Sequence, residues 1–282
     1  RPSEAAAGGT ARPWHHLADG TFRNPPGSPE RGGGFGEWAG FFYRRLVRPP
    51  APPAVPPGHV LDPEAAIEGL EATVGVDSVT WLGHAAFLFR LGGRTILTDP
   101  YLSERASPFT GFGPARFAGP ALPPERLPPV DLLLLSHNHY DHLDMPALAR
   151  LPRLAGASVV MPLRVGRYLD PDRFAQALEV DWLQRVEIAG IAVTAVPAVH
   201  FSKRGLFDRN ASLWCGYLIE AGGRCVLFTG DTAYGPVFRT TAAGLPRPEL
   251  ACVPIGAYEP RLLMRGSHCT PEEAVAIGRD WG

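Results

Sequence analysis

One stretch of this sequence decides its fold: Leu132-Leu133-Leu134-Leu135-Ser136-His137-Asn138-His139-Tyr140-Asp141-His142-Leu143-Asp144. Four consecutive leucines predict a strand that is buried on both faces, and the strand ends abruptly in three histidines and two carboxylates. Because residues two apart in an extended segment point the same way, His137 and His139 can share one metal ion, and the following turn brings Asp141 and His142 to a second. A loop whose histidines only form hydrogen bonds is the alternative, but such a cluster is costly to bury unless metal or solvent satisfies it.

Two later strands also end in side chains that can bind metal. Residues 194–200 have the sequence TAVPAVH, and beside the first cluster we predict His200 as a third nitrogen ligand, although a lone histidine at a strand end is usually an ordinary surface residue. Residues 225–232 have the sequence CVLFTGDT, and here Asp231 can bridge two cations while Gly230 lets the backbone approach closely. Three separate segments thus contribute to one predicted metal centre.

The composition of the chain changes near residue 74. Residues 1–73 are rich in proline and glycine and are predicted to form an arm that wraps or precedes the domain, because such a segment cannot build a packed core by itself. Residues 74–282 alternate apolar runs with helical stretches and are predicted as one α+β domain of mixed sheets with helices outside. We expect strands at residues 76–81, 86–91, 94–99, 130–136, 158–161, 186–197, 213–220, 224–230 and 250–255, and helices after Pro63, Asp144, Pro236 and Thr270.

Within the arm, residues 37–46, EWAGFFYRRL, combine aromatic rings with arginines. Such an amphipathic segment either contacts a lipid surface or packs back on its own domain. We favour packing, since amphipathic segments more often cover their own core, and we keep peripheral membrane contact as the alternative.

Composition and charge exclude several classes of protein. A formal net charge of -1 over 282 residues argues against a general nucleic-acid binder, and no nucleic-acid partner is expected. The longest apolar runs, such as residues 132–135, are far shorter than the roughly 18 residues of a membrane-spanning helix. The four cysteines form no CxxC pair and are expected to be free, buried thiols in a reducing compartment, which predicts a cytoplasmic protein with membrane association as an addition. The first residue is Arg1, so we expect the natural start to be missing.

The combination of HxHxDH after an apolar strand, a strand-end histidine and TGDT resembles the metallo-β-lactamase superfamily. Within it, the closer resemblance is to the N-acylphosphatidylethanolamine phospholipase D-like group and covers about residues 79–276. It is carried by residues 79–85 (VTWLGHA), 98–100 (TDP), 105–108 (RASP), 136–144 (SHNHYDHLD) and 254–261 (PIGAYEPR). The resemblance implies that residues 74–282 form a hydrolase domain with the four-layer αββα sandwich of the superfamily.

Carried over to this chain, the family pattern implies two Zn²⁺ ions held by six side chains, one by His137, His139 and His200, the other by Asp141 and His142, with Asp231 bridging both. The family adds a further histidine from a strand beyond the helix that begins at Thr270, whereas this sequence stops at Gly282. We therefore expect the sequence to be a fragment that lacks the C-terminal elements of the fold. Asp280 lies at the end of the predicted helix and is not counted as a ligand.

The remaining site residues are assigned roles with their alternatives. Asp141 and Asp231 are predicted as catalytic metal ligands. His268 matches a histidine that lines the active site in this family and is predicted to contact substrate or to donate a proton, with a structural role as the alternative. Tyr258 and Arg261 are predicted to face the substrate, although an arginine after a strand is usually solvated or ion-paired.

Two further residues lie near strand ends, and two histidines lie near the N-terminus. His84 and Asp99 either orient the metal ligands or serve in packing and turns. The isolated His15 and His16 are expected to be surface residues.

The implied activity is that of a binuclear zinc-dependent hydrolase, a phosphodiesterase that cleaves N-acylphosphatidylethanolamine-type phospholipids into N-acylethanolamine and phosphatidic acid by attack of a hydroxide held between the metals. The expected partner is a phospholipid or other small phosphodiester, and the oligomeric state is left open. A lactonase or small-molecule phosphodiesterase of the same superfamily is the alternative enzyme. A non-catalytic metal-binding scaffold and, less favoured, a redox di-iron centre are the alternatives from other classes.

Overall fold

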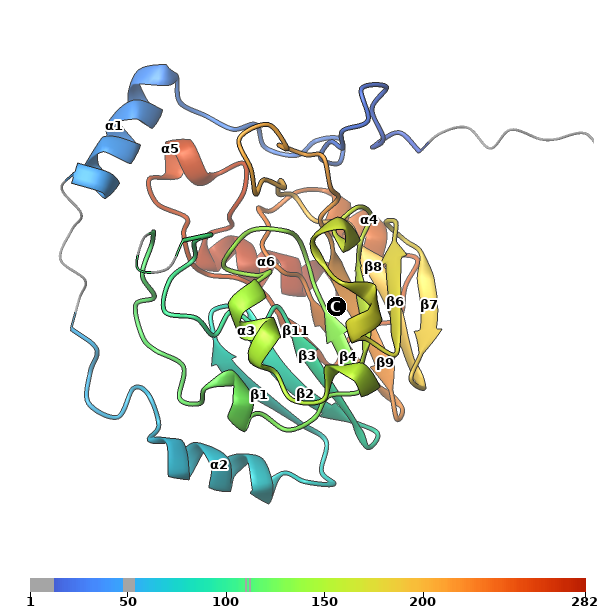
Figure 1. Ribbon diagram of the computed structural model, residues 1–282. Helices are drawn as coiled ribbons and strands as arrows, with labels where there is room; N and C mark the ends of the chain where they lie inside the picture. Colours follow the sequence, from blue (N-terminus) through green and yellow to red (C-terminus); the bar gives the residue numbers. More distant parts are fainter. Residues whose placement is uncertain (1–12, 48–53, 110, 112) are drawn as a thin grey trace, which may run out of the picture.

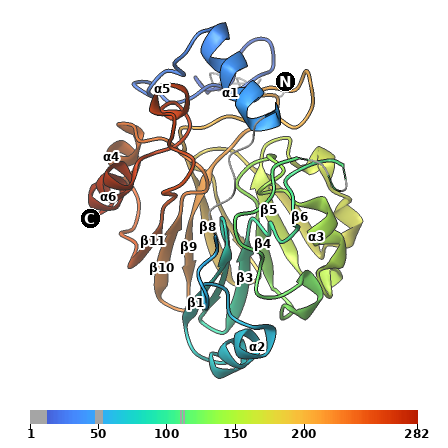
Figure 2. The ribbon, with the colours of Figure 1, turned by 90° about the vertical axis from the view of Figure 1, so that its left-hand side faces the viewer.

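A computed structural model of the chain describes residues 13–47, 54–109, 111 and 113–282. It contains two β-sheets that pack face to face (Figure 1 and Figure 2). In spatial order, the first sheet comprises β1 Ser78–Gly83, β2 Ala86–Leu91, β3 Arg94–Thr98, β4 Leu132–Leu134, β5 Ser158–Pro162 and β6 Gln176–Val180. The second comprises β11 Leu250–Cys252, β10 Arg224–Phe228, β9 Gly216–Ala221, β8 Ile191–Val196 and β7 Arg185–Ile188.

Helices cover the outer faces of both sheets, as Figure 2 shows. The α-helices are α1 Phe35–Val47, α2 Pro63–Ala72, α3 Met145–Arg150, α4 Val237–Ala242, α5 Arg261–Met264 and α6 Pro271–Asp280, with 3₁₀ turns at Pro124–Arg126, Leu154–Gly156, Gly166–Tyr168 and Pro171–Arg173. Side chains of α2 and α3 pack on the first sheet, and side chains of α4 and α6 pack on the second. The predicted α+β sandwich with four layers is confirmed. None of the described helices has the length and apolar character needed to span a membrane.

The leucine run 132–135 shows why its strand is apolar at every position. Leu132 and Leu134 point into the hydrophobic cluster between the two sheets, whereas Leu133 and Leu135 belong to the cluster under α2 and α3. All four side chains are fully buried, which contributes about 1.5–3 kcal/mol for each. A strand covered on both faces therefore leads directly into the histidine-rich loop.

Two strands differ from the sequence prediction. The segment 186–197 is a hairpin and not one strand, because Ala189 and Gly190 both adopt positive φ and form the tight turn between β7 and β8. Strand β6 was not predicted. It lies at the edge of the first sheet and carries Gln176 and Glu179 on exposed positions, so it lacks a continuous apolar signal.

Part of the N-terminal arm packs onto the domain. The ring of Phe22 lies in the cluster between the sheets with 2% of its surface exposed. His15 and His16 are not surface residues as expected: their Nε2 atoms lie 2.6 and 2.7 Å from the two carboxylate oxygens of Asp181, and His15 stacks on Trp182. The sequence could not reveal this because the partner lies more than 160 residues away. The domain boundary near residue 74 stays a prediction.

All four cysteines are free, as expected. Cys215 and Cys269 are buried, and Cys225 and Cys252 are half-buried. Burial raises the pKa of each thiol, to about 11 for Cys225 and Cys252 and to about 12 for Cys269. These thiols therefore stay protonated near neutral pH and are poor metal ligands.

Helix α6 begins with the predicted capping box. The Thr270 hydroxyl accepts a hydrogen bond from the Glu273 amide, and the Glu273 carboxylate accepts one from the Thr270 amide at 2.9 Å. Replacing Thr270 with alanine is expected to lower the free energy of unfolding by about 1 kcal/mol, because one amide of the first turn loses its acceptor. Urea denaturation measures this change. Thr240→Ala, an exposed position inside α4, is the matched control, and an equal loss in both variants would contradict the capping role.

Candidate metal centre

Most of the chemically active side chains follow the carboxyl ends of strands. Asp99 follows β3, residues 137–142 follow β4, His200 follows β8 and Asp231 follows β10. Main-chain hydrogen bonds join these loops, since the amide of Asp99 donates to Leu134 and the amide of Ala233 donates to Val199. Strands of both sheets thus deliver residues distant in sequence to one edge of the sandwich.

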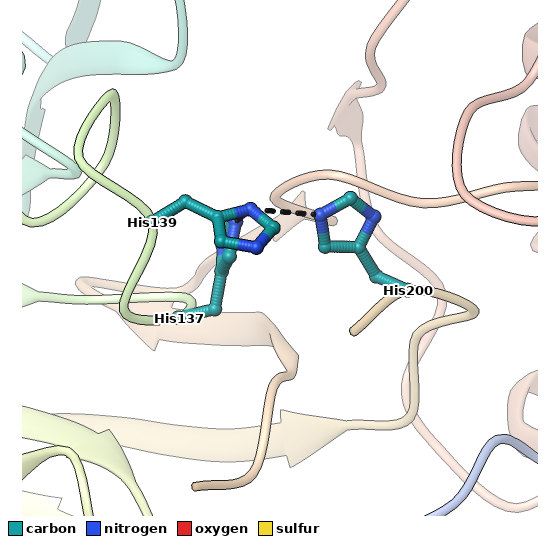
Figure 3. Close-up of side chains that lie close together, drawn as sticks. All are labelled: His137, His139 and His200. Atoms are coloured by element: carbon teal, nitrogen blue, oxygen red, sulfur yellow. Dashed lines mark hydrogen bonds between the residues drawn. The ribbon is translucent and has the colours of Figure 1, made fainter. Parts of the chain in front are cut away.

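Three histidine rings converge at the centre of this edge, as Figure 3 shows. Nδ1 of His139 lies 2.8 Å from Nε2 of His137 and 3.3 Å from Nε2 of His200. The rings of His137 and His200 are almost completely buried, each with 1% exposure. The structure therefore brings together the three nitrogens predicted for the first metal ion.

In His137 and His200, the Nδ1 atom forms a hydrogen bond that defines the tautomer of the ring. Nδ1 of His200 lies 2.9 Å from the carbonyl oxygen of Ser267, which can only accept. The Ser136 hydroxyl donates to the Asp99 carboxylate at 2.5 Å and therefore accepts from Nδ1 of His137, 2.8 Å away. Both histidines thus carry the proton on Nδ1 and direct the Nε2 lone pair into the cluster, which is the form that binds metal.

A second group of ligand atoms adjoins the first. Nδ1 of His142 donates to Asp99 at 2.7 Å, and its buried Nε2 has no hydrogen-bond partner among the residues that the structure describes. Ligand atoms of His84, Asp141 and His142 lie within 4.8 Å of one another. Nε2 of His84 lies 3.3 Å from Oδ2 of Asp141. A cation at this position fits the structure because it would satisfy the orphaned Nε2 atom.

Asp231 lies between the two groups. Its Oδ2 is 3.3 Å from Nε2 of His142 and 3.9 Å from Nε2 of His200. The same oxygen is 3.8 Å from Nδ1 of His268. This position suits a carboxylate that contacts two cations at once.

The electrostatics of the first group favour the neutral histidine rings that bind metal. Burial lowers the pKa of His137 and His200 well below the usual value and that of His139 to about 4, so these rings are neutral near pH 7. Burial opposes the charge on Asp231, but the positive charge of His142 beside it outweighs this effect and holds the pKa of Asp231 well below its usual range. Burial likewise opposes the charge on His142, and its carboxylate neighbours raise the pKa above the usual value. The pocket therefore favours positive charge between these carboxylates.

Asp99 and His84, which the sequence left undecided, both lie against the cluster. Asp99 is fully buried and accepts from the amide and hydroxyl of Ser136 as well as from His142. It thereby orients one histidine from each group. Both Asp99 and His84 adopt positive φ, a conformation that is uncommon outside glycine and marks sites where the surrounding structure imposes the backbone.

Two positioning residues were not predicted. Nη1 of Arg204 donates to the carbonyls of Asn138 and Leu143 at 2.9 and 2.8 Å, and its guanidinium stacks on Tyr140, so this side chain holds the histidine loop from both ends. The side chain of Asn24 accepts a hydrogen bond from the amide of His200 at 3.0 Å. Neither residue carries a motif, because each acts through a partner far away in the sequence.

Three further residues discussed from the sequence contribute no atom to the ligand groups described above. Arg261 forms the ion pair that was given as its alternative: its guanidinium binds the Glu273 carboxylate and the main-chain oxygen of His268, so it supports the segment that carries His268. Its contact with substrate stays a prediction. Tyr258 lies in the loop between β11 and α5, and its contact with substrate stays a prediction. Asp280 binds Tyr234 and Arg239, in agreement with its exclusion from the ligands.

Comparisons with known proteins show the family of the chain. A family model described as the beta-lactamase superfamily domain matches residues 94–282. The chain is 37% identical over 225 residues to N-acyl-phosphatidylethanolamine-hydrolyzing phospholipase D 1 of Caenorhabditis elegans, covering 72% of this chain and 63% of that protein. It is 31% identical over 208 residues to the mitochondrial N-acyl-phosphatidylethanolamine-hydrolyzing phospholipase D of Saccharomyces cerevisiae, covering 71% and 44%. The chain thus spans roughly half the length of these relatives.

Solved structures share the fold at lower identity. The isothiocyanate hydrolase from Delia radicum gut bacteria superimposes with a TM-score of 0.53 at 18% identity, over 72% of this chain and 80% of that one. CmlA, a diiron β-hydroxylase from Streptomyces venezuelae, superimposes with a TM-score of 0.51 at 24% identity, over 76% and 49%. At these identities the likeness concerns the fold alone.

Proposed function

The chain belongs to the family of the beta-lactamase superfamily domain, and from this premise we propose that it is a metal-dependent phosphodiesterase acting on N-acylphosphatidylethanolamine-type phospholipids. The observation that carries the proposal is the position of the Asp231 carboxylate between two groups of buried ligand atoms. The names of the relatives from Caenorhabditis elegans and Saccharomyces cerevisiae point to the same substrate.

We propose two Zn²⁺ ions per chain. The first would be held by His137, His139 and His200, the second by Asp141 and His142, and Asp231 would contact both. The ring of His84 offers a further ligand atom at the second position. Bound there, the cations would supply Lewis acidity toward the phosphoryl oxygens and activate water near neutral pH.

The protein's own residues would then orient and protonate the reacting groups. Cleavage adds the oxygen of water to phosphorus and breaks the bond from phosphorus to the ethanolamine oxygen, which leaves phosphatidic acid. The leaving oxygen needs a proton, and His268 is the proposed donor because its partly exposed ring lies beside Asp231. Main-chain and side-chain contacts from Arg261 and Glu273 hold the segment that positions this ring.

From the sequence we favour packing of residues 37–46 on the domain, but most described side chains of helix α1 are exposed, and we propose this helix as the point of peripheral membrane contact. It lies beside α5 on the outside of the sandwich (Figure 1), and Phe35, Phe42 and Tyr43 expose 90%, 51% and 55% of their surface. Arg44 and Arg45 in its last turn add positive charge. Exposed aromatic rings next to arginines suit the boundary between lipid headgroups and acyl chains.

A parallel assay of two substrate classes tests the proposed function. We expect the metal-loaded protein to release N-acylethanolamine and phosphatidic acid from mixed micelles of N-acylphosphatidylethanolamine, and excess chelator to reduce the rate by at least about 10³-fold because the Lewis acid is lost. The same preparation is tested on an N-acyl homoserine lactone. A clear preference for the lactone would contradict the lipid substrate and favour the alternative lactonase.

A further inference from the structure

A cavity of about 310 Å³ shares a wall with the metal centre, because His200 and Ser267 both line it. The opposite wall is the N-terminal segment 24–31, which runs beside the loop after β8 (Figure 1). Hydrogen bonds from Phe22 to Asn210 and from His200 to Asn24 join the two walls. The arm that the sequence separated from the domain therefore helps to enclose a space next to the ligands.

The cavity is lined by two arginines that form no ion pair among the described residues. Arg31 and Arg209 both line it, and Glu30 is the one carboxylate among its lining residues. Within the described ranges, neither guanidinium forms an ion pair or a hydrogen bond. Burial lowers the pKa of both arginines, and the charge of Arg31 lowers that of Arg209 further, so the two cations are close enough to repel each other. Two neighbouring cations of this kind favour an anion between them.

Both guanidiniums are held by stacking and keep their N–H groups free. Cζ of Arg31 lies 3.7 Å from the ring centre of Trp38, and Cζ of Arg209 lies 4.4 Å from that of Phe201. Stacking uses the face of a guanidinium and leaves the planar edge with its donors available. The cavity thus offers two stacked cations with free donors.

We propose that this cavity is a phosphate-binding subsite in which Arg31 and Arg209 form charge-assisted hydrogen bonds to the oxygens of a phosphate monoester. Paired guanidinium edges match the tetrahedral oxygens and the charge of such a group. The inference rests on the proposed function in one respect: phosphatidic acid, the product of that reaction, ends in a phosphate monoester. The subsite would receive this group beside the metal centre and retain the product.

Direct binding of inorganic phosphate to the metal-loaded chain, measured by calorimetry, tests the subsite. Arg31→Gln and Arg209→Gln are each expected to weaken phosphate binding about tenfold, because each removes a charge-assisted hydrogen bond. Arg31→Lys retains the charge and is expected to bind more tightly than Arg31→Gln, and Glu30→Gln is expected to strengthen binding. Arg247→Gln, which lines a different cavity, is the matched control, and equal unfolding temperatures verify that the variants are folded. Phosphate affinity that is the same in all variants would place the anion on the metals alone and overturn the subsite.

Vesicles identify the source of the phosphate group. Phosphatidylcholine vesicles with and without phosphatidic acid are mixed with each protein, and bound protein is measured by flotation. If the Arg31→Gln and Arg209→Gln variants bind phosphatidic acid vesicles more weakly than the original protein, the subsite receives a lipid headgroup. If these variants lose affinity for inorganic phosphate but bind the vesicles as the original protein does, the subsite receives a water-soluble phosphate ester. These readouts need no turnover, so a chain that binds phosphate through the arginines without cleaving the lipid would refute the proposed function and leave the subsite standing.

Discussion

Replacing Asp231 with asparagine is expected to lower kcat by about 10³-fold, equivalent to roughly 4 kcal/mol of transition-state stabilisation. Asparagine has nearly the same shape as aspartate but carries no charge. The single oxygen that lies 3.3 Å from His142 and 3.9 Å from His200 would no longer attract cations on both sides. The change is measured by steady-state kinetics on the proposed lipid, with metal content determined by elemental analysis on the same sample.

Asp280→Asn is the matched control for this variant. Its carboxylate is nearly buried but binds Tyr234 and Arg239, and kcat is expected to stay within about twofold of the original value because no reacting group touches it. A metal-replete Asp231→Asn protein that keeps full activity would show that the carboxylate does not take part in the reaction.

Replacing Asp99 with asparagine is expected to weaken zinc binding by about 10- to 100-fold. One oxygen of Asp99 accepts hydrogen bonds from both the Ser136 hydroxyl and Nδ1 of His142. In asparagine, an NH₂ group at the position of this oxygen would point its hydrogens at the two donors. In the flipped orientation the NH₂ group would instead face the amide of Ser136, which donates to the other oxygen at 2.7 Å. One substitution therefore disturbs His142 directly and His137 through Ser136.

Competition with a chelating dye measures the zinc affinity of the Asp99→Asn protein, and thermal unfolding in the presence of zinc gives a second readout. Asp77→Asn serves as the control, since Asp77 lies on the surface and binds the amide of Gly92 and the guanidinium of Arg224. Unchanged zinc affinity in Asp99→Asn, combined with an intact fold, would assign Asp99 to packing alone.

Much of the fold and of the ligand set was predictable because the signals are local. Leucines at four successive positions require burial on two faces, and that requirement alone predicts a strand between two apolar layers. The spacing of His137, His139, Asp141 and His142 follows from a strand that ends in a turn. The capping box at Thr270 and Glu273 is equally local, and α6 begins at the expected residue.

Predictions failed where the partner of a residue lies far along the chain. His15 and His16 look like isolated polar residues in a proline-rich arm, yet Asp181 binds both. Strand β6 has no apolar pattern of its own and exists because β5 offers it hydrogen bonds along its length.

The residue pattern by itself determined mixed sheets with helices outside, most strand ends and the kinds of ligand available, since burial, turns and caps depend on neighbours within a few residues. The four-layer arrangement was an implication of the family resemblance. Only the tertiary structure decided which carboxylate orients which histidine and which oxygen lies between the two groups. It also decided that the arm closes a cavity lined by Arg31 and Arg209. These relations depend on distances of a few ångströms between residues that are brought together only when two sheets pack.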